Sequence, residues 1–71
     1  MSFNFDKLRG KIIECYGTIE KFSLKLGVTS TTVGRKLSGK NGWTQDEIIK
    51  SCELLSIPIN DIPAYFFYRV S

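Results

Sequence analysis

The chain has 71 residues, of which 42% are hydrophobic and 24% charged, and its net charge is +3. This length suits one small domain, so a single domain over residues 1–71 is expected, with the composition of an ordinary folded protein. No apolar run approaches the ~20 residues of a membrane span, and the first residues lack the basic and apolar stretches of a secretion signal. We therefore expect a protein of the cytoplasm with no membrane partner.

The residue inventory argues against catalysis and metal binding. The chain has no histidine, the commonest general base and metal ligand. Its two cysteines, Cys15 and Cys52, cannot supply the four ligands of a structural zinc site. Both stand in apolar patterns, which predicts buried free thiols. We expect no enzyme, no metal, no cofactor and no small-molecule ligand.

The charges are unevenly distributed along the chain. Residues 21–40 hold five cations and no anion, whereas residues 41–61 hold four anions against Lys50, a net charge of −3. A local basic field of this kind is typical of a protein that binds a polyanion. An ordinary solvated surface is the alternative interpretation.

The first predicted helix covers residues 5–16. Asn4 or Ser2 can cap its N-terminus, and Asp6 lies in its first turn. One apolar stripe follows from the spacing of Phe5, Leu8, Ile12 and Cys15. Gly17 ends the helix.

Two shorter helices follow, over residues 19–26 and 30–38. Thr18 can cap the earlier one, and Gly27 ends it in a short turn. Thr29 or Ser30 can cap the later one, which Gly39 ends. The pairs predicted to face the core are Phe22 with Leu26, and Val33 with Leu37.

The remaining pattern predicts a fourth helix, a short fifth one and an aromatic tail. Thr44 and Glu47 form a capping-box pattern, and Ile48, Cys52 and Leu55 then share one face. Trp43 can cover the core or reach a phosphate. A short helix is expected near residues 59–64, and residues 65–71 can be extended. The predicted fold is all-α, with five helices and a short aromatic C-terminal tail.

The segment over residues 18–38 has the form of a helix-turn-helix. Its second helix is short, basic and polar on the outer side, as required of a helix that enters the major groove of DNA. At these residues the sequence resembles the Cro/CI, or XRE-type, family, and in particular small Cro-type repressors of temperate phages. Ser23, Gly27, Thr29 and Val33 stand where that family places its small residue, turn glycine, cap and core aliphatic. Ile19 and Lys36 depart from its pattern.

The resemblance implies a lambda-repressor-like fold and a transcriptional repressor that acts in the bacterial host cell. It would bind double-stranded operator DNA as a homodimer, with its third helix in the major groove. Arg35 is assigned to base readout, although Lys36 could exchange roles with it, and Ser30 and Thr31 could equally be capping residues. The residues expected to read bases are Ser30, Thr31, Gly34, Arg35 and Ser38, and those expected to contact phosphates are Thr18, Lys21, Thr29, Lys36, Lys40 and Asn41.

Four consecutive aromatic residues near the C-terminus cannot all be hidden in a small monomer. They are therefore assigned to dimerisation, and they are Tyr65, Phe66, Phe67 and Tyr68. The alternative is that they fold back over the first and fourth helices. A second interpretation of the whole chain is kept open. It is a protein-interaction module of the same fold, either an anti-repressor that holds another repressor or an antitoxin-type regulator.

Overall fold

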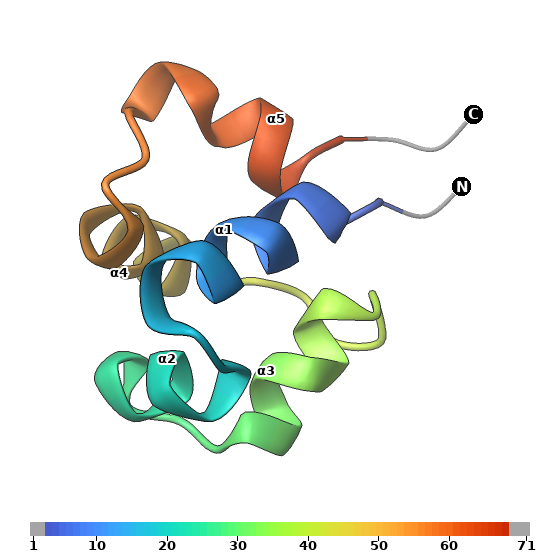
Figure 1. Cartoon of the computed structure of the whole chain (residues 1–71). Helices are drawn as coiled ribbons and strands as arrows, with labels where there is room; N and C mark the ends of the chain where they lie inside the picture. Colours follow the sequence, from blue (N-terminus) through green and yellow to red (C-terminus); the bar gives the residue numbers. More distant parts are fainter. Residues whose placement is uncertain (1–2, 69–71) are drawn as a thin grey trace.

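The computed structural model describes residues 3–68, which form five α-helices and one short 3-10 helix (Figure 1). The all-α, five-helix prediction is confirmed. The helices are α1 (Asp6–Tyr16), α2 (Ile19–Leu26), α3 (Ser30–Leu37), α4 (Gln45–Leu55), η1 (Ile59–Asp61) and α5 (Ile62–Phe66). No helix within residues 3–68 is long and apolar enough to cross a membrane.

Threonine caps set the start of three helices. The hydroxyls of Thr18, Thr29 and Thr44 accept hydrogen bonds from the backbone N–H three residues later, at 3.2 Å in each case. Thr44 and Glu47 form the complete capping box, because the Glu47 carboxylate also accepts from the Thr44 N–H at 2.9 Å. Such a cap stabilises a helix by about 1 kcal/mol, which explains why these boundaries could be predicted from local sequence.

The turn between α2 and α3 depends on Gly27. Its φ of 89° is left-handed, and its N–H and that of Val28 both donate to the Ser23 carbonyl, at 2.9 and 3.1 Å. A side chain at this backbone angle would be strained. The turn thus ends α2 sharply and lets α3 start at Ser30, three residues after Gly27.

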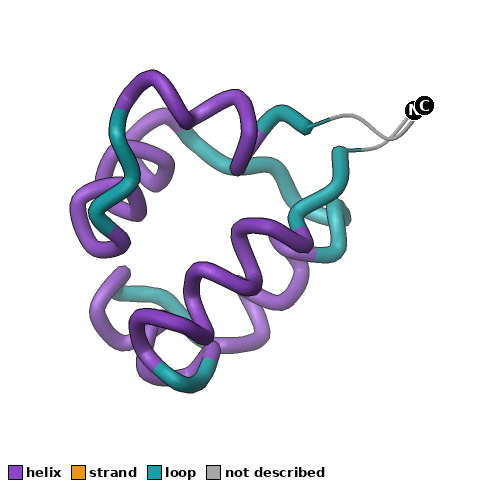
Figure 2. Tube along the Cα trace, turned by 45° about the horizontal axis from the view of Figure 1, so that its top comes forward, coloured by secondary structure: helices purple, strands orange, loops and turns teal. Residues whose placement is uncertain are grey.

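The core lies between α1 and the ring of other helices around it. α1 packs against α2, α3, α4 and α5, and the tube view shows these helices surrounding the molecule's centre (Figure 2). Complete burial of a Leu, Ile or Phe side chain contributes about 1.5–3 kcal/mol. The largest fully buried apolar side chains are Phe22, Phe66, Leu8, Ile12, Leu55 and Val33.

The structure corrects two details of the sequence prediction and agrees with two others. Cys15 is exposed, because Tyr16 occupies the inner position at that end of α1 and its hydroxyl donates to the Leu54 carbonyl at 3.0 Å. Cys52 is buried as expected. Tyr65 and Phe66 belong to α5 rather than to an extended tail. Of the predicted caps of α1, the Asn4 side chain accepts from the Asp6 N–H at 2.7 Å, and Ser2 lies outside the described residues.

Candidate functional site

The helix-turn-helix segment has the arrangement that the sequence predicted. α2 and α3 are joined by the turn at residues 27–29 and pack against each other at one end of the molecule (Figure 1). Val33 and Leu37 face the core from α3, and the polar residues of α3 lie toward the other side. α3 ends at Leu37, so Ser38 is its C-cap rather than its last residue.

The five residues assigned to base readout lie along the outer side of α3. Thr31, Arg35 and Ser38 are exposed, and Ser30 and Gly34 are half-buried. The Ser38 hydroxyl donates to the Arg35 carbonyl at 3.0 Å, and the N–H groups of Lys40 and Asn41 donate to the same carbonyl. These bonds close the C-terminal end of α3, so Ser38 has a local structural role.

The six residues assigned to phosphate contact do not form one group. Thr18 and Thr29 use their hydroxyls as helix caps, and the Thr29 hydroxyl also contacts that of Thr32 at 2.9 Å. Lys21, Lys40 and Asn41 are exposed at separate places around α2 and the end of α3. Lys36 is the exception, because it lies in the interior.

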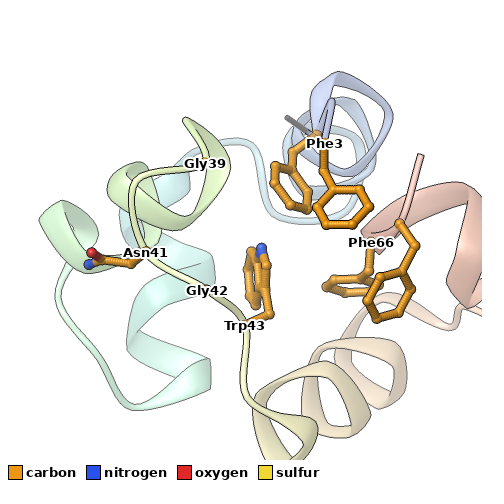
Figure 3. Close-up of a pocket in the computed structure, with 8 residues that line it drawn as sticks. Phe3, Gly39, Asn41, Gly42, Trp43 and Phe66 are labelled. Atoms are coloured by element: carbon orange, nitrogen blue, oxygen red, sulfur yellow. The ribbon is translucent and has the colours of Figure 1, made fainter. Parts of the chain in front are cut away.

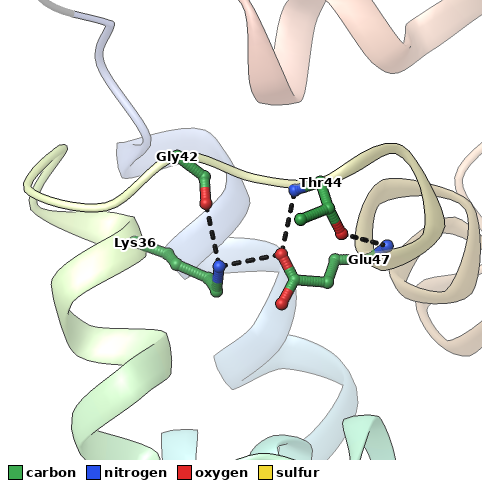
Figure 4. A network of polar contacts seen from close by, with 4 residues as sticks. All are labelled: Lys36, Gly42, Thr44 and Glu47. Carbon is green, nitrogen blue, oxygen red and sulfur yellow. Dashed lines mark hydrogen bonds and ion pairs between the residues drawn. The ribbon is translucent and has the colours of Figure 1, made fainter.

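Lys36 is buried and fixed by polar contacts. Its side chain is 7% exposed, and its Nζ lies 2.8 Å from Glu47 Oε1 and 2.8 Å from the Gly42 carbonyl oxygen (Figure 4). It also lies 5.7 Å from the centre of the Trp43 ring. Lys36 thereby ties the end of α3 to the start of α4, and this position does not suit the phosphate contact expected of it.

The same network sets the charge state of Glu47. Burial raises the pKa of this carboxyl, but the hydrogen bond from Lys36, the N–H and hydroxyl of Thr44 and the positive charge of Lys36 together outweigh that effect and lower the pKa below its ordinary value. Glu47 is therefore ionised at neutral pH, and its negative charge is compensated inside the molecule.

An exposed leucine interrupts the polar surface of α2. Leu24 is 80% exposed and lines a hollow of about 300 Å³ together with Glu20, Ser23, Val28, Thr29 and Ser30. The sequence analysis missed this residue, although its position between Ser23 and Lys25, outside the Phe22–Leu26 pair, already placed it on the outer side. An aliphatic side chain here suits contact with a protein better than contact with a phosphate.

Aromatic residues gather at the end of the molecule where the two described chain ends meet, and we call this cluster the aromatic end (Phe3, Phe5, Trp43, Phe66 and Phe67). The Trp43 and Phe66 rings meet edge to face with centroids 5.2 Å apart, and Phe3 meets Phe67 in the same way at 5.8 Å. Their side chains border a hollow of about 390 Å³ (Figure 3). The Trp43 Nε1–H is buried and finds no acceptor among residues 3–68.

The four residues assigned to dimerisation differ in burial. Phe66 is 2% exposed and belongs to the core, and Tyr65 lies half-buried under the Lys7 ammonium at 4.8 Å. Both therefore follow the alternative, in which the aromatics fold back on the domain. Phe67 and Tyr68 remain exposed. Trp43 covers the core, as expected in the first of its two interpretations.

A further hollow lies beside α4, and we call it the α4–α5 hollow. Its volume is about 410 Å³, and it is lined by Trp43, Gln45, Ile48, Ile49, Ile62 and Phe67. Ile49 is 49% exposed. Its position next to the buried stripe of α4 did not predict this exposure. No group of three or more Cys, Asp or Glu side chains in residues 3–68 is arranged to hold a metal ion.

Two comparisons place this fold among known proteins. A family model described as "Protein of unknown function (DUF739)" matches residues 1–69. The chain belongs to the DUF739 family. It is also similar to a solved structure, the modulator of repression (MOR) of the temperate bacteriophage TP901-1 from Lactococcus lactis. The two share 42% sequence identity over 94% of this chain and 90% of that chain, with a TM-score of 0.80. No curated protein matches the sequence.

These comparisons correct the interpretation drawn from the helix-turn-helix pattern. The identification with small Cro-type repressors of the Cro/CI family is wrong, because the matching family is DUF739 and the similar solved protein is a modulator of repression. The main functional prediction, a homodimeric repressor on palindromic operator DNA, is therefore also wrong. The roles toward bases and phosphates assigned to α2 and α3 presuppose operator DNA and lose their basis with it. The alternative, a protein-interaction module of the same fold, is favoured.

Proposed function

We propose that this DUF739 protein is a regulatory protein-interaction module of a temperate phage, which modulates repression by binding the phage's repressor protein. The observation that carries the proposal is the extensive similarity to the phage TP901-1 modulator of repression, which extends over nearly the whole of both chains. The protein would act in the cytoplasm of the host cell, where the repressor is found, and without catalysis or a cofactor.

The surface of the domain supports a protein partner. Large apolar side chains are exposed on several elements: Leu24 on α2, Ile49 on α4, Ile59 on η1 and Phe67 after α5. A protein interface can cover such side chains with apolar groups of its own, whereas the charged phosphates of a DNA backbone provide no apolar contact. The helix-turn-helix form of α2 and α3 is compatible with a protein partner, since one fold supports many functions.

Binding to the repressor tests the proposal directly. The chain and the repressor encoded by the same prophage are purified, and their association is measured by isothermal titration calorimetry and size-exclusion chromatography. Repressor occupancy of its operator is then followed by gel retardation with increasing amounts of the chain. We expect a stoichiometric complex and a change in operator occupancy. Absence of both would refute the proposed function.

A further inference from the structure

The α4–α5 hollow combines an apolar floor with exposed aliphatic side chains at its edge. Its lining is contributed by isoleucines and aromatic rings, with Gln45 as the single polar side chain. Ile49 and Phe67 are each 49% exposed. A volume of about 410 Å³ falls within the range of small binding clefts, about 300–1,000 Å³. An apolar side chain inserted into the hollow would therefore contact apolar groups on several sides.

Acidic residues flank the exposed edge of this hollow. Asp46 and Glu53 stand three residues before and four residues after Ile49 in α4, so the three share one face of the helix. Both carboxylates are exposed. Asp61, also exposed, directly precedes Ile62 of the hollow. The edge therefore presents several negative charges around one aliphatic side chain.

The positive charges of the neighbourhood do not cancel this field. Lys50 is the one cation among residues 41–61, and its ammonium reaches toward α2, where it donates to the Leu26 carbonyl at 3.3 Å. Lys36 is buried and paired with Glu47. Lys50 stands four residues after Asp46 and three before Glu53, so it lies on their side of α4. Its ammonium nevertheless contacts the Leu26 carbonyl and forms no ion pair with either carboxylate among residues 3–68.

We infer that the α4–α5 hollow is the docking site for a cationic protein segment that inserts an aliphatic or aromatic side chain beside Ile49. Lysine or arginine side chains of that segment meet Asp46 and Glu53, and its apolar side chain is covered by Ile48, Ile62 and Phe67. The inference rests on the proposed function and adds the surface and the partner chemistry. Charge favours this face over that of α2. Near Leu24 the exposed cations Lys21 and Lys25 outnumber the exposed anion Glu20, and this net positive charge would repel a cationic segment.

Matched substitutions on α4 and α2 test the inference. The first pair is Ile49→Ser and its control Leu24→Ser, each of which removes one exposed aliphatic side chain. The second pair is Asp46→Lys with Glu53→Lys, and its control Lys21→Glu with Lys25→Glu. All these positions are exposed, so each variant should fold, which circular dichroism checks. Association with the purified repressor is measured by surface plasmon resonance at several salt concentrations.

We expect Ile49→Ser to weaken binding at least about tenfold through faster dissociation. The α4 charge reversal should lower the association rate by a similar factor and reduce its dependence on salt. Both α2 controls should bind within about twofold of the unmodified chain.

Three results would overturn the inference. If the unmodified chain binds the repressor but the α4 variants bind equally well, or no worse than the α2 variants, the site is wrong while the proposed function stands. If the unmodified chain does not bind, the proposed function fails and this inference fails with it. If sedimentation shows that the chain forms a dimer that Ile49→Ser dissociates, the hollow is covered by a second copy rather than by a cationic partner.

Discussion

Replacing Lys36 by methionine tests how much the buried ion pair contributes to stability. Methionine keeps much of the apolar volume of the lysine side chain but removes the ammonium. The substitution leaves the Glu47 carboxylate without its cation and the Gly42 carbonyl without its donor, both now at 2.8 Å from Nζ. The question is how large a loss of unfolding free energy results.

The geometry bounds the magnitude. Breaking a fully buried ion pair costs about 3–5 kcal/mol. Lys36 is nearly inaccessible, with 7% of its side chain exposed, but Glu47 is 22% exposed, so water can solvate part of the remaining charge. We therefore expect a loss of about 2 kcal/mol, against a total stability of roughly 4–10 kcal/mol for a chain of this length. Such a loss lowers the melting temperature by roughly 8–16 °C.

A double-mutant cycle isolates the pair itself. Lys36→Met, Glu47→Gln and the combined variant are unfolded with urea, and their free energies of unfolding are compared. Once one partner is gone, loss of the other removes little more, so we expect a coupling energy of about 1–2 kcal/mol. A coupling below about 0.5 kcal/mol, the value of an exposed pair, would refute this account of the α3–α4 connection.

The cycle also has a pH signature. Because the pKa of Glu47 is lowered in the folded state, the unfolded chain binds more protons at acid pH. The stabilisation is complete above the ordinary glutamate pKa of about 4.3 and is lost as the pH falls through the folded value. The stability difference between the unmodified chain and Glu47→Gln should therefore shrink below about pH 4. An unchanged difference at pH 3 would contradict the lowered pKa.

Three further predictions concern the core, the glycines and the thiols. Phe66→Ala should destabilise the domain by about 3–5 kcal/mol in urea unfolding, because this ring is buried beneath Trp43. Gly27→Ala should destabilise it by about 1–2 kcal/mol, since φ there is 89°. Gly34→Ala should instead stabilise it by up to about 1 kcal/mol, because an added methyl group meets no atom within 4 Å beyond the local backbone of α3. Equal signs at the two glycines would refute this contrast. In the unmodified chain, a thiol reagent should modify the exposed Cys15 quickly and Cys52 slowly, since burial also raises the pKa of Cys52.

Local signals made most of the fold predictable. The threonine caps at residues 18, 29 and 44 depend on neighbours three positions away, and the turn at Gly27 depends on one backbone angle. Burial of Lys36 depends on Glu47, eleven residues later in the chain. Its one local signal was its position three residues after Val33, on the inner stripe of α3.

The functional surfaces were harder to foresee for a different reason. The exposed state of Ile49 depends on how α4 is placed against α5, which periodicity within α4 does not define. The helix-turn-helix pattern of α2 and α3 reports the fold, and that pattern is compatible with more than one kind of partner. The sequence shows that residues 21–40 are basic and residues 41–61 acidic. It does not show which of these charged side chains are exposed and which, like Lys36 and Glu47, pair with each other.

The two ends of the described part of the chain, residues 3–68, are joined by a backbone hydrogen bond from the Asn4 N–H to the Tyr68 carbonyl at 2.7 Å. A circularly permuted chain, in which a short linker connects these two positions, should therefore retain the native arrangement of all five helices. New termini would then be opened in the exposed loop at residues 39–41. In such a permutant, the two chain segments that now meet beside Phe3 and Phe67 become an internal turn. A label or surface attachment then moves to the loop at residues 39–41, which borders the same hollow of the aromatic end.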